Sequence, residues 1–383
     1  MVGLYYGYVL AGVGGFFLLF CLANILWMRR HSRGILSCDG PRVSVLVPAR
    51  NEEDNIRNCL DSLLNQTYRN YEILVLNDNS EDNTLAILRE YEQKFPGKVR
   101  CFDGKPLPHD WQGKCYAMHQ LTARAEGEFL LFTDADTVHT PDSVSYAAAN
   151  LIRNNADMIS GYIHQDLLTL GERLTVPLMF MLTGFILLLP LDKVLRNPMF
   201  AAAIGQYIAV RASSFRAIGG YEAVKKMTTE DMYLARLLKR AGYKTLFIMT
   251  ESVARCRMYH SYRDAVCGIG KNIFDFFEKR TAVLFVILAA IVIFMLFPPF
   301  ILFYRVVAAL FFAQPLDTFA LCLAVHVALI FLAWFTLFWF QKLPLGPAFY
   351  YPVLFVNLTI MAMYSWYGSM FGVGYLWKGR LIK

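Results

Sequence analysis

Two aspartates separated by one residue follow an apolar run in the stretch EFLLFTDADTV, residues 128–138. The run Phe129–Phe132 is too short for a helix and holds aromatic residues that favour strands, so we expect a buried strand here. Side chains two apart on an extended chain point the same way, so Asp134 and Asp136 could present two carboxylates to one point. Such a pair suits a hard divalent cation. The same residues could instead cap a helix that starts near Thr140.

A second pair of carboxylates stands in MTTEDMYLARLLKRAGY, residues 227–243. The apolar spacing predicts a helix with Thr228 or Thr229 as its N-cap and with Glu230 and Asp231 in its first turn, where carboxylates are favoured. Capping alone would account for this pattern. Because leucines anchor the helix in the core, the acidic pair is nevertheless left at an exposed helix start.

A glycine and a lysine precede another predicted helix in LPHDWQGKCYAMHQ, residues 107–120. Lys114 and the backbone N–H groups that follow Gly113 could meet a phosphate, because a helix start attracts anions. The spacing is not that of a Walker A loop.

The elements that would position these groups form an alternating pattern over residues 42–249, in which short apolar runs alternate with helical patterns. This pattern is typical of an α/β layered domain. Three predicted strands end in polar residues, and ligands of open α/β sheets bind beyond the carboxyl ends of strands. The three strands and their polar ends are Val43–Ala49 with Arg50-Asn51-Glu52, Ile73–Asn77 with Asp78-Asn79-Ser80, and Phe129–Thr133 with Asp134-Ala135-Asp136.

The two ends of the chain are too apolar for a soluble protein. Hydrophobic residues make up 56% of the sequence and charged residues 17%, and the first 28 residues carry no charge. The stretch Tyr5–Trp27 exceeds the roughly 20 residues that cross a bilayer, and no basic residue precedes it as in a signal peptide. Further spans are expected in Thr281–Tyr304, Thr318–Phe340 and Leu343–Trp377, for a total of four or five.

Basic residues collect on the cytosolic side of membrane proteins. Arg29, Arg30 and Arg33 after the first span, with Lys279 and Arg280 before the second, therefore predict a cytosolic middle. The net charge of +7 is explained by such flanking residues facing anionic lipid, and it does not indicate nucleic-acid binding. The eight cysteines include no C-x-x-C pair, which argues against structural zinc.

The apolar segment 173–191 is long enough to cross a membrane, but a crossing would put the Asp134 and Asp231 clusters on opposite sides. We therefore expect an interfacial segment, broken by Pro177 and Pro190, that lies against the bilayer.

Five motifs in order resemble the membrane-bound family 2 glycosyltransferases of the GT-A fold: VSVLVPARNEEDNI, VLNDNSEDNT, LLFTDADT, GGYEAV and TEDMYLARLLKRAGY. The stretch DWQGKCYAMHQL is similar to the group of ceramide glucosyltransferases and hopanoid- and carotenoid-associated glycosyltransferases. The resemblance covers about residues 40–280. It implies an α/β, GT-A (Rossmann-like) catalytic domain at 40–280 in the cytosol, between a transmembrane helix at 1–30 and C-terminal transmembrane helices at 281–377. A bacterial protein of this kind would reside in the inner membrane.

The resemblance also implies site residues. Glu52 and Asp78 would lie around the nucleoside of the donor, and Gly113, Lys114, Asp134 and Arg257 would also bind the donor. Asp134 and Asp136 would be ligands of a Mg²⁺ or Mn²⁺ that bridges the diphosphate. Asp231 would be the general base, with Glu230 beside it.

One family motif is missing, since many relatives carry Q/R-x-x-R-W after the T-E-D segment. The corresponding stretch here, ARCRMYHSYRDAVCGIGKN (254–272), has no R-W pair. Arg255 or Arg257 is expected to supply the charge and Tyr259 the aromatic surface.

The implied reaction moves a sugar, with UDP-glucose as the family's commonest donor, onto a membrane lipid such as a ceramide, hopanoid or carotenoid. Attack opposite the leaving diphosphate would invert the anomeric centre and give a β-glycolipid. A processive polysaccharide synthase and a transporter with a nucleotide-binding domain are the alternatives.

Overall fold

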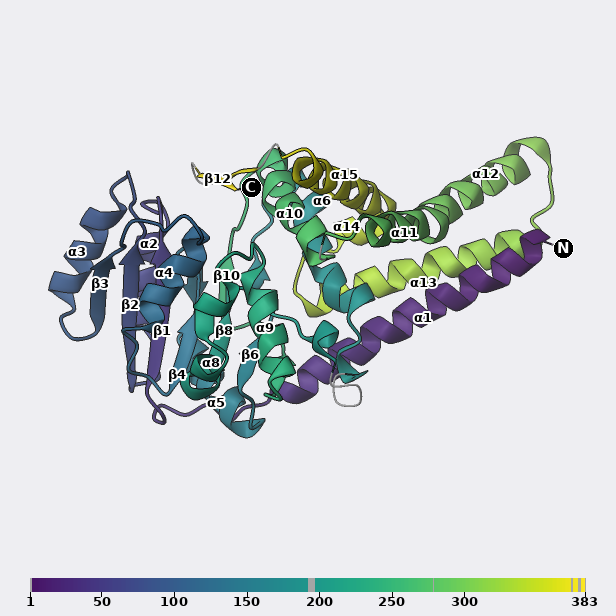
Figure 1. Cartoon of the computed structure of the whole chain (residues 1–383). Coiled ribbons are helices and arrows are strands. Elements are labelled where there is room, and N and C mark those ends of the chain that lie inside the picture. The colour runs from purple at the N-terminus through teal and green to yellow at the C-terminus, as the bar shows by residue number, and fades with distance from the viewer. Residues whose placement is uncertain (1, 192–196, 278, 373–374, 378–379, 383) are drawn as a thin grey trace. The chain divides into compact units, whose positions relative to one another are not determined.

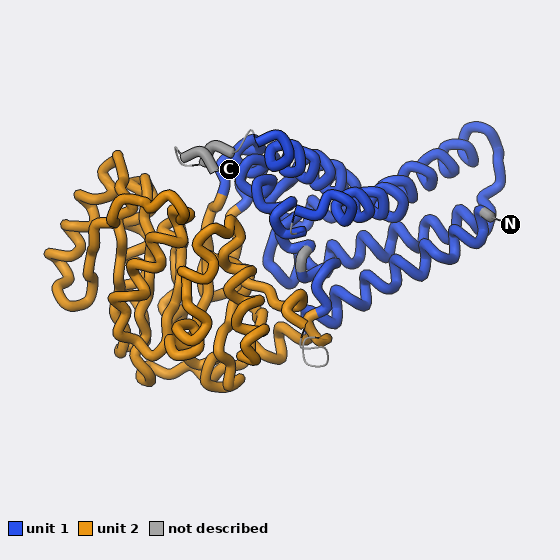
Figure 2. The backbone as a smooth tube through the Cα atoms, viewed as in Figure 1, with its two compact units in different colours: residues 1–26, 167–188, 259–383 blue, residues 27–166, 189–258 orange. Residues whose placement is uncertain are grey.

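The computed structural model describes residues 2–191, 197–277, 279–372, 375–377 and 380–382 (Figure 1). Its contacts divide the chain into two units (Figure 2). Residues 27–166 and 189–258 form one, called here the sheet unit. Residues 1–26, 167–188 and 259–383 form the other, called the helical unit.

The sheet unit is built on a seven-stranded sheet in the order β3-β2-β1-β4-β8-β6-β9. The strands are β1 (Val43–Ala49), β2 (Tyr71–Asn77), β3 (Val99–Asp103), β4 (Phe129–Phe132), β6 (Met158–Ser160), β8 (Ile208–Arg211) and β9 (Thr245–Phe247). Strand β1 pairs in parallel with β2 and β4, whereas β8 runs antiparallel to both β4 and β6. The carboxyl ends of β1, β2 and β4 and the amino end of β8 therefore meet at one edge, which we call the carboxyl edge.

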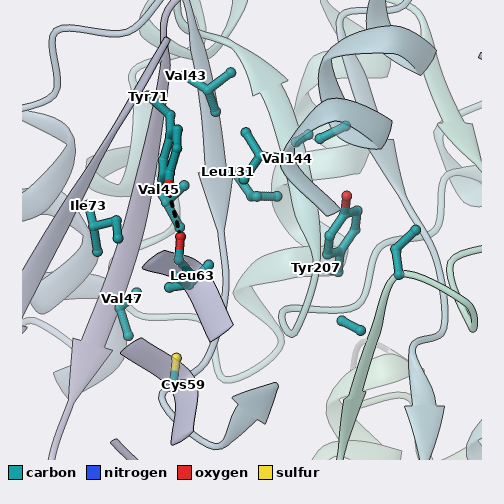
Figure 3. Close-up of a cluster of buried hydrophobic side chains, with 14 of the residues drawn as sticks. Val43, Val45, Val47, Cys59, Leu63, Tyr71, Ile73, Leu131, Val144 and Tyr207 are labelled. Carbon is teal, nitrogen blue, oxygen red and sulfur yellow. Dashed lines mark hydrogen bonds between the residues drawn. The ribbon is translucent and has the colours of Figure 1, made fainter. Parts of the chain in front are cut away.

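The central strands are apolar on both faces, so helices must cover both. These helices are α2 (Ile56–Leu64), α3 (Thr84–Lys94), α4 (Gly113–Thr122), α5 (Ser143–Arg153), α8 (Ala212–Ala217) and α9 (Glu230–Arg240), with 3₁₀ turns η3 (Leu189–Leu191), η4 (Pro198–Phe200) and η5 (Gly220–Val224). On one face, Val45 and Ile73 pack with Cys59 and Leu63 of α2, and the Tyr71 hydroxyl donates to the Leu63 carbonyl at 2.8 Å (Figure 3). On the other face the core includes Leu46, Leu74 and Leu130 from the strands, Cys115 and Leu121 from α4, and Leu234 and Leu238 from α9.

A second, three-stranded sheet lies in the same unit. It joins β5 (Thr137–His139), β10 (Ala254–Cys256) and β7 (His164–Gln165) in the order β5-β10-β7. Because β5 begins one residue after Asp136, this sheet holds the chain directly beyond the two aspartates.

The helical unit contains the long apolar helices, of which the first, α1, has its last residues, 27–31, in the sheet unit. Its main elements are α1 (Val2–His31), α6 (Leu170–Thr175), η1 (Val176–Phe180), η2 (Leu182–Ile186), α10 (Tyr262–Phe276), α11 (Thr281–Ile291), η6 (Val292–Leu296), α12 (Phe297–Phe312), α13 (Thr318–Phe340), α14 (Gly346–Phe349), α15 (Tyr351–Met370) and the hairpin β11 (Tyr375–Trp377)–β12 (Arg380–Ile382). Within the described ranges, three helices are long and apolar enough to cross a membrane: Gly3–His31, Thr281–Phe312 and Thr318–Phe340. This agrees with the predicted α/β domain flanked by apolar helices.

The prolines at 298 and 299 do not divide residues 281–312. They occupy the first turn of α12, where proline is tolerated, and a π-helical turn joins α11 to α12 in one continuous run. Helix α15 in the predicted region 343–377 is not among the three candidate spans.

The apolar segment 173–191 forms short helical pieces in place of one long helix. Its Phe185 ring packs on Phe17 of α1 and on Trp334 of α13, at centroid distances of 5.5 and 5.0 Å. The Asn24 amide donates to the carbonyl of Leu187 at 2.7 Å. Phe185 and Leu187 are thus buried by contacts with α1 and α13, whereas Ile186 between them is exposed, and a position of this segment against a bilayer stays a prediction.

Candidate active site

The loops after β1 and β2 interlock at the carboxyl edge. Asp78 donates its backbone N–H to the Ala49 carbonyl at 2.8 Å, and the Arg50 guanidinium donates to the Asp78 carbonyl at 2.7 Å. Glu52 and Asp78 are 6% and 7% exposed, and one Glu52 oxygen accepts from the Asn55 amide at 2.9 Å. Two of the predicted donor-binding carboxylates are therefore held in adjacent, mutually bonded loops.

Neither Asp134 nor Asp136 is the N-cap residue of a helix. The N-caps of α2, α3 and α5 are Asn55, Asn83 and Asp142, and none makes a side-chain capping bond. The capping alternative for Asp134 and Asp136 is thus wrong. Thr229 is the N-cap residue of α9 as expected, but its side chain makes no capping bond.

The turn with Asp134 and Asp136 joins β4 to β5. The Thr137 N–H donates to the Asp134 carbonyl at 3.2 Å, and the Cys59 thiol lies 3.8 Å from the same oxygen. Burial raises the pKa of the Cys59 thiol, and the nearby negative charges of Asp136, Glu52 and Asp134 raise it further. Cys59 is thus buried close enough to Glu52, Asp134 and Asp136 for their charges to act on its thiol.

Lys114 joins the two acidic pairs that stand far apart in the sequence. Its ammonium lies 2.6 Å from Asp134 Oδ1 and 3.6 Å from Glu230 Oε1. Gly113 begins α4, so Lys114 is in the first turn of that helix. Burial alone would lower the pKa of Lys114, but the charges of Asp134, Glu230 and Asp231 outweigh it and raise that pKa. The lysine therefore keeps its positive charge between the two acidic pairs.

The Asp231 carboxylate accepts hydrogen bonds from two backbone N–H groups. The Gly205 N–H donates to its Oδ2 at 2.8 Å, and the Met232 N–H donates to its Oδ1 at 2.7 Å. Burial and then the charge of Glu230 raise the pKa of Asp231 to about 7, against the opposing effects of Lys114 and the two N–H groups. A carboxylate that exchanges its proton near neutral pH suits a general base.

Arg257 lies beside the aspartate turn. Strands β5 and β10 pair antiparallel with Cys256 opposite Thr137. Arg257 follows Cys256 and Asp136 precedes Thr137, so both lie at the same end of this pairing. Arg255 is exposed on β10, and Tyr259 belongs to the helical unit, where its ring packs against Gly268. Of the three candidates to replace the R-W pair, Arg257 has the position closest in register to Asp136.

The carboxylates of Asp134 and Asp136 suit a divalent cation whose remaining ligands come from a bound substrate and water. Carboxylate oxygens are the ligands that Mg²⁺ and Mn²⁺ prefer, and Asp134 and Asp136 offer them from one turn. Among the described residues, no group of three or more His, Cys, Asp or Glu side chains forms a ready-made metal site. Two carboxylates leave most coordination positions open, as a bound diphosphate and water would require.

Gly205 and Gln206 are site residues that sequence reasoning missed. Gln206 is 3% exposed, and its amide bridges the Gln165 side chain at 3.0 Å to the Cys256 sulfur at 2.8 Å. Both residues precede β8, whereas the residues predicted from the sequence follow the carboxyl ends of strands. The only available signal was a glycine just before a short apolar run.

Residues 44–219 match the family model described as Glycosyl transferase family 2. The "Probable glycosyltransferase YdaM" of Bacillus subtilis is 29% identical over 211 residues, which cover 54% of this chain and 49% of that protein. The Escherichia coli protein named "UDP-Glc:alpha-D-GlcNAc-diphosphoundecaprenol beta-1,3-glucosyltransferase WfgD" is 27% identical over 119 residues, or 31% of this chain and 44% of that protein. The chain thus spans about half or less of these curated relatives.

Among solved structures, the mannosyltransferase PcManGT from Pyrobaculum calidifontis, in complex with GDP-Man and Mn²⁺, superposes with a TM-score of 0.58 at 19% identity. The likeness covers 95% of this chain and 98% of that one. At this identity it shows the fold alone, and with the family match it confirms the predicted GT-A fold. The narrower resemblance to the ceramide, hopanoid and carotenoid group is not confirmed by these relatives.

Proposed function

We propose that this chain, whose residues 44–219 match glycosyl transferase family 2, is a glycosyltransferase. It would move a sugar from a nucleotide-sugar donor to a membrane lipid with inversion of the anomeric centre. The observation that carries the proposal is the convergence of Lys114, Asp134, Glu230 and Asp231 at the carboxyl edge of the sheet. A phosphate-binding cation and a carboxylate base are the groups that this reaction needs.

The donor would lie against the interlocked loops after β1 and β2. Glu52 and Asp78 would bind the nucleoside, and Lys114, helped by Arg257, would bind the diphosphate. Asp134 and Asp136 would hold a Mg²⁺ or Mn²⁺, which as a Lewis acid neutralises charge on the departing diphosphate. Manganese accompanies the donor in the structure of the Pyrobaculum relative, which supports this choice of cation.

The acceptor hydroxyl would lose its proton to Asp231. The N–H groups of Gly205 and Met232 fix the orientation of this carboxylate by donating to both oxygens, so little reorganisation is needed when the proton arrives. Glu230 stands beside it with an oxygen 3.6 Å from the Lys114 ammonium. A base on the face of the sugar opposite the diphosphate gives inversion, and an α-linked donor would yield a β-glycoside.

A membrane lipid is the proposed acceptor because the helical unit supplies three candidate spans. The E. coli relative, by its name, acts on a diphosphoundecaprenol-linked sugar, which is another lipid-borne acceptor. The arginines at 29, 30 and 33 favour a cytosolic position of the sheet unit, where nucleotide sugars are made. UDP-glucose is the first donor to test, with GDP-mannose, UDP-galactose and UDP-GlcNAc beside it.

The test uses the purified full chain in mixed micelles with Mn²⁺, a panel of nucleotide sugars, and membrane lipid extract present or absent. Release of nucleoside diphosphate that depends on one donor and on the lipid fraction is expected. The matched control is Asp231→Asn, which should lose about 10²–10⁴-fold in transfer rate while donor affinity stays near wild type. Absence of release with every donor would overturn the proposal.

A further inference from the structure

The Lys114 ammonium forms an ion pair with Asp134, one of the two proposed metal ligands. Its nitrogen is 2.6 Å from Asp134 Oδ1, a short charge-assisted hydrogen bond. A divalent cation bound at that oxygen would face a positive charge at the same place. In this arrangement, lysine and metal compete for Asp134.

Gly205 makes room for this position of the lysine. A Cβ atom on Gly205 would lie 2.9 Å from Lys114 Nζ, closer than real Cβ contacts allow, and 3.6 Å from Asp231 Oδ2. A side chain at 205 would therefore crowd the ammonium in its position at Asp134. The glycine therefore permits the pair.

Only the lysine side chain needs to move for the pair to break. The start of α4 is fastened, because the Gln112 N–H donates to the Lys225 carbonyl at 2.7 Å and the Cys115 thiol lies 3.7 Å from the Val224 carbonyl. The Lys114 side chain itself is 38% exposed and has a flexible four-carbon stem. Its location in the first turn of α4 is one that anions favour.

Resting on the function proposed above, we propose that Lys114 occupies Asp134 in the nucleotide-free protein, and that an incoming diphosphate draws the ammonium away and so frees this carboxylate for the divalent cation. Nucleotide and cation then strengthen each other's binding. By linkage, the factor by which the nucleotide raises cation affinity equals the factor by which the cation raises nucleotide affinity. Lys114 is in this sense a positioning residue that sets when the metal enters.

The test measures binding of Mn²⁺ alone to the full chain in micelles, from the electron paramagnetic resonance signal of the free ion, and repeats it with saturating UDP and with GDP. The wild type should bind Mn²⁺ at least about fivefold more tightly with the favoured nucleotide. Lys114→Met should bind Mn²⁺ more tightly than wild type when no nucleotide is present, and the nucleotide effect should fall towards onefold. Lys226→Met, which removes an exposed positive charge, should behave as wild type.

A second variant, Gly205→Ala, displaces the ammonium but keeps its charge. It should also bind Mn²⁺ alone more tightly than wild type, which simple removal of a positive charge cannot explain. If both variants bind Mn²⁺ alone no more tightly than wild type, the competition is wrong although nucleotide-dependent metal binding and the proposed function stand. If neither the wild type nor any variant binds Mn²⁺ or either nucleotide, both the competition and the proposed function are wrong.

Discussion

His139 ties the two ends of the aspartate turn together. Its Nε2 lies 2.9 Å from Thr133 Oγ1, so the residue before Asp134 and a residue three positions after Asp136 share one hydrogen bond. The other ring nitrogen, Nδ1, lies 2.8 Å from Ser143 Oγ at the start of α5. The ring is 5% exposed and links β4, β5 and α5 beneath the proposed metal ligands.

This buried ring predicts a pH-dependent stability. Burial lowers the pKa of His139 to about 3, whereas an unfolded histidine titrates near about 6.5. Between these values the unfolded chain binds a proton that the folded chain refuses, so His139 lowers the free energy of unfolding by about 1.4 kcal/mol per pH unit as the pH falls. Thermal unfolding of wild type and His139→Gln from pH 7 to pH 4 would reveal a shallower pH dependence in the variant. Parallel curves would contradict the assignment.

The pKa of Asp231 predicts how transfer depends on pH. Because this pKa is raised to about 7, the carboxylate loses its charge below neutrality, and the transfer rate should fall about tenfold per pH unit there. Donor affinity should change less over the same range. The measurement is nucleoside diphosphate release at saturating donor from pH 5.5 to pH 8.5. A rate that stays level down to pH 5.5 would exclude Asp231 as the base.

Removal of one proposed metal ligand should uncouple donor binding from manganese. Asp136→Ala is expected to weaken Mn²⁺-dependent donor binding by at least about tenfold, since even indirect supports of metal ligands contribute that much. Asp142→Ala is the matched control, because Asp142 is exposed and its side chain accepts from the Thr67 hydroxyl at 2.8 Å. Calorimetric titration of donor with and without Mn²⁺ gives the answer, and an unchanged metal effect in Asp136→Ala would remove the assignment.

The opposite edge of the sheet holds a buried carboxylate that should affect stability and leave binding intact. Glu72 is 2% exposed, accepts from the Ser44 hydroxyl at 2.6 Å, and pairs with Arg42 at 3.1 Å and Arg100 at 3.4 Å. Glu72→Ala should lower the free energy of unfolding by about 3 kcal/mol, because the network loses its buried carboxylate and keeps only the exposed Glu126 as a partner for Arg42 and Arg100. Glu72→Gln should cost less, since its amide oxygen can still accept.

The readout for Glu72 is the thermal midpoint, compared with nucleotide affinity measured well below it. Glu72 is near the start of β2 and Asp78 lies beyond its carboxyl end, so the affinity should stay near wild type. A loss of nucleotide affinity in the stably folded variant would mean that the two ends of β2 are coupled.

Sequence reasoning located the carboxyl-edge residues because parallel strands deliver them in a regular way. Glu52, Asp78 and Asp134 each follow a strand with strong apolar character, and β1, β2 and β4 are indeed adjacent in the sheet. The direction of β8 could not be predicted in this way, since three apolar residues and an arginine do not indicate whether a strand runs parallel or antiparallel. Gly205 and Gln206 enter the site because β8 is antiparallel, and this depends on the tertiary fold.

Contacts between residues far apart in the sequence could not be predicted from local sequence patterns either. The approach of Lys114 to Asp134 requires α4 and β4 to be placed by the packed core, and no spacing in the sequence encodes it. The broken form of residues 173–191 was predictable in outline from Pro177 and Pro190. The succession of 3₁₀ and π turns depends on packing against α1 and α13.

The chain leaves the sheet unit after Asp166 and returns to it at Leu189, while β6 and β8 on either side of this excursion pair directly with each other. Ile204 also donates its N–H to Ser160 Oγ at 2.9 Å, which closes the gap from within the sheet unit. Residues 167–188 thus form an excursion whose two flanking strands are held together without it. We therefore expect this segment to tolerate changes in length and sequence while the register of β6 and β8 is kept, because that register depends on contacts within the sheet unit.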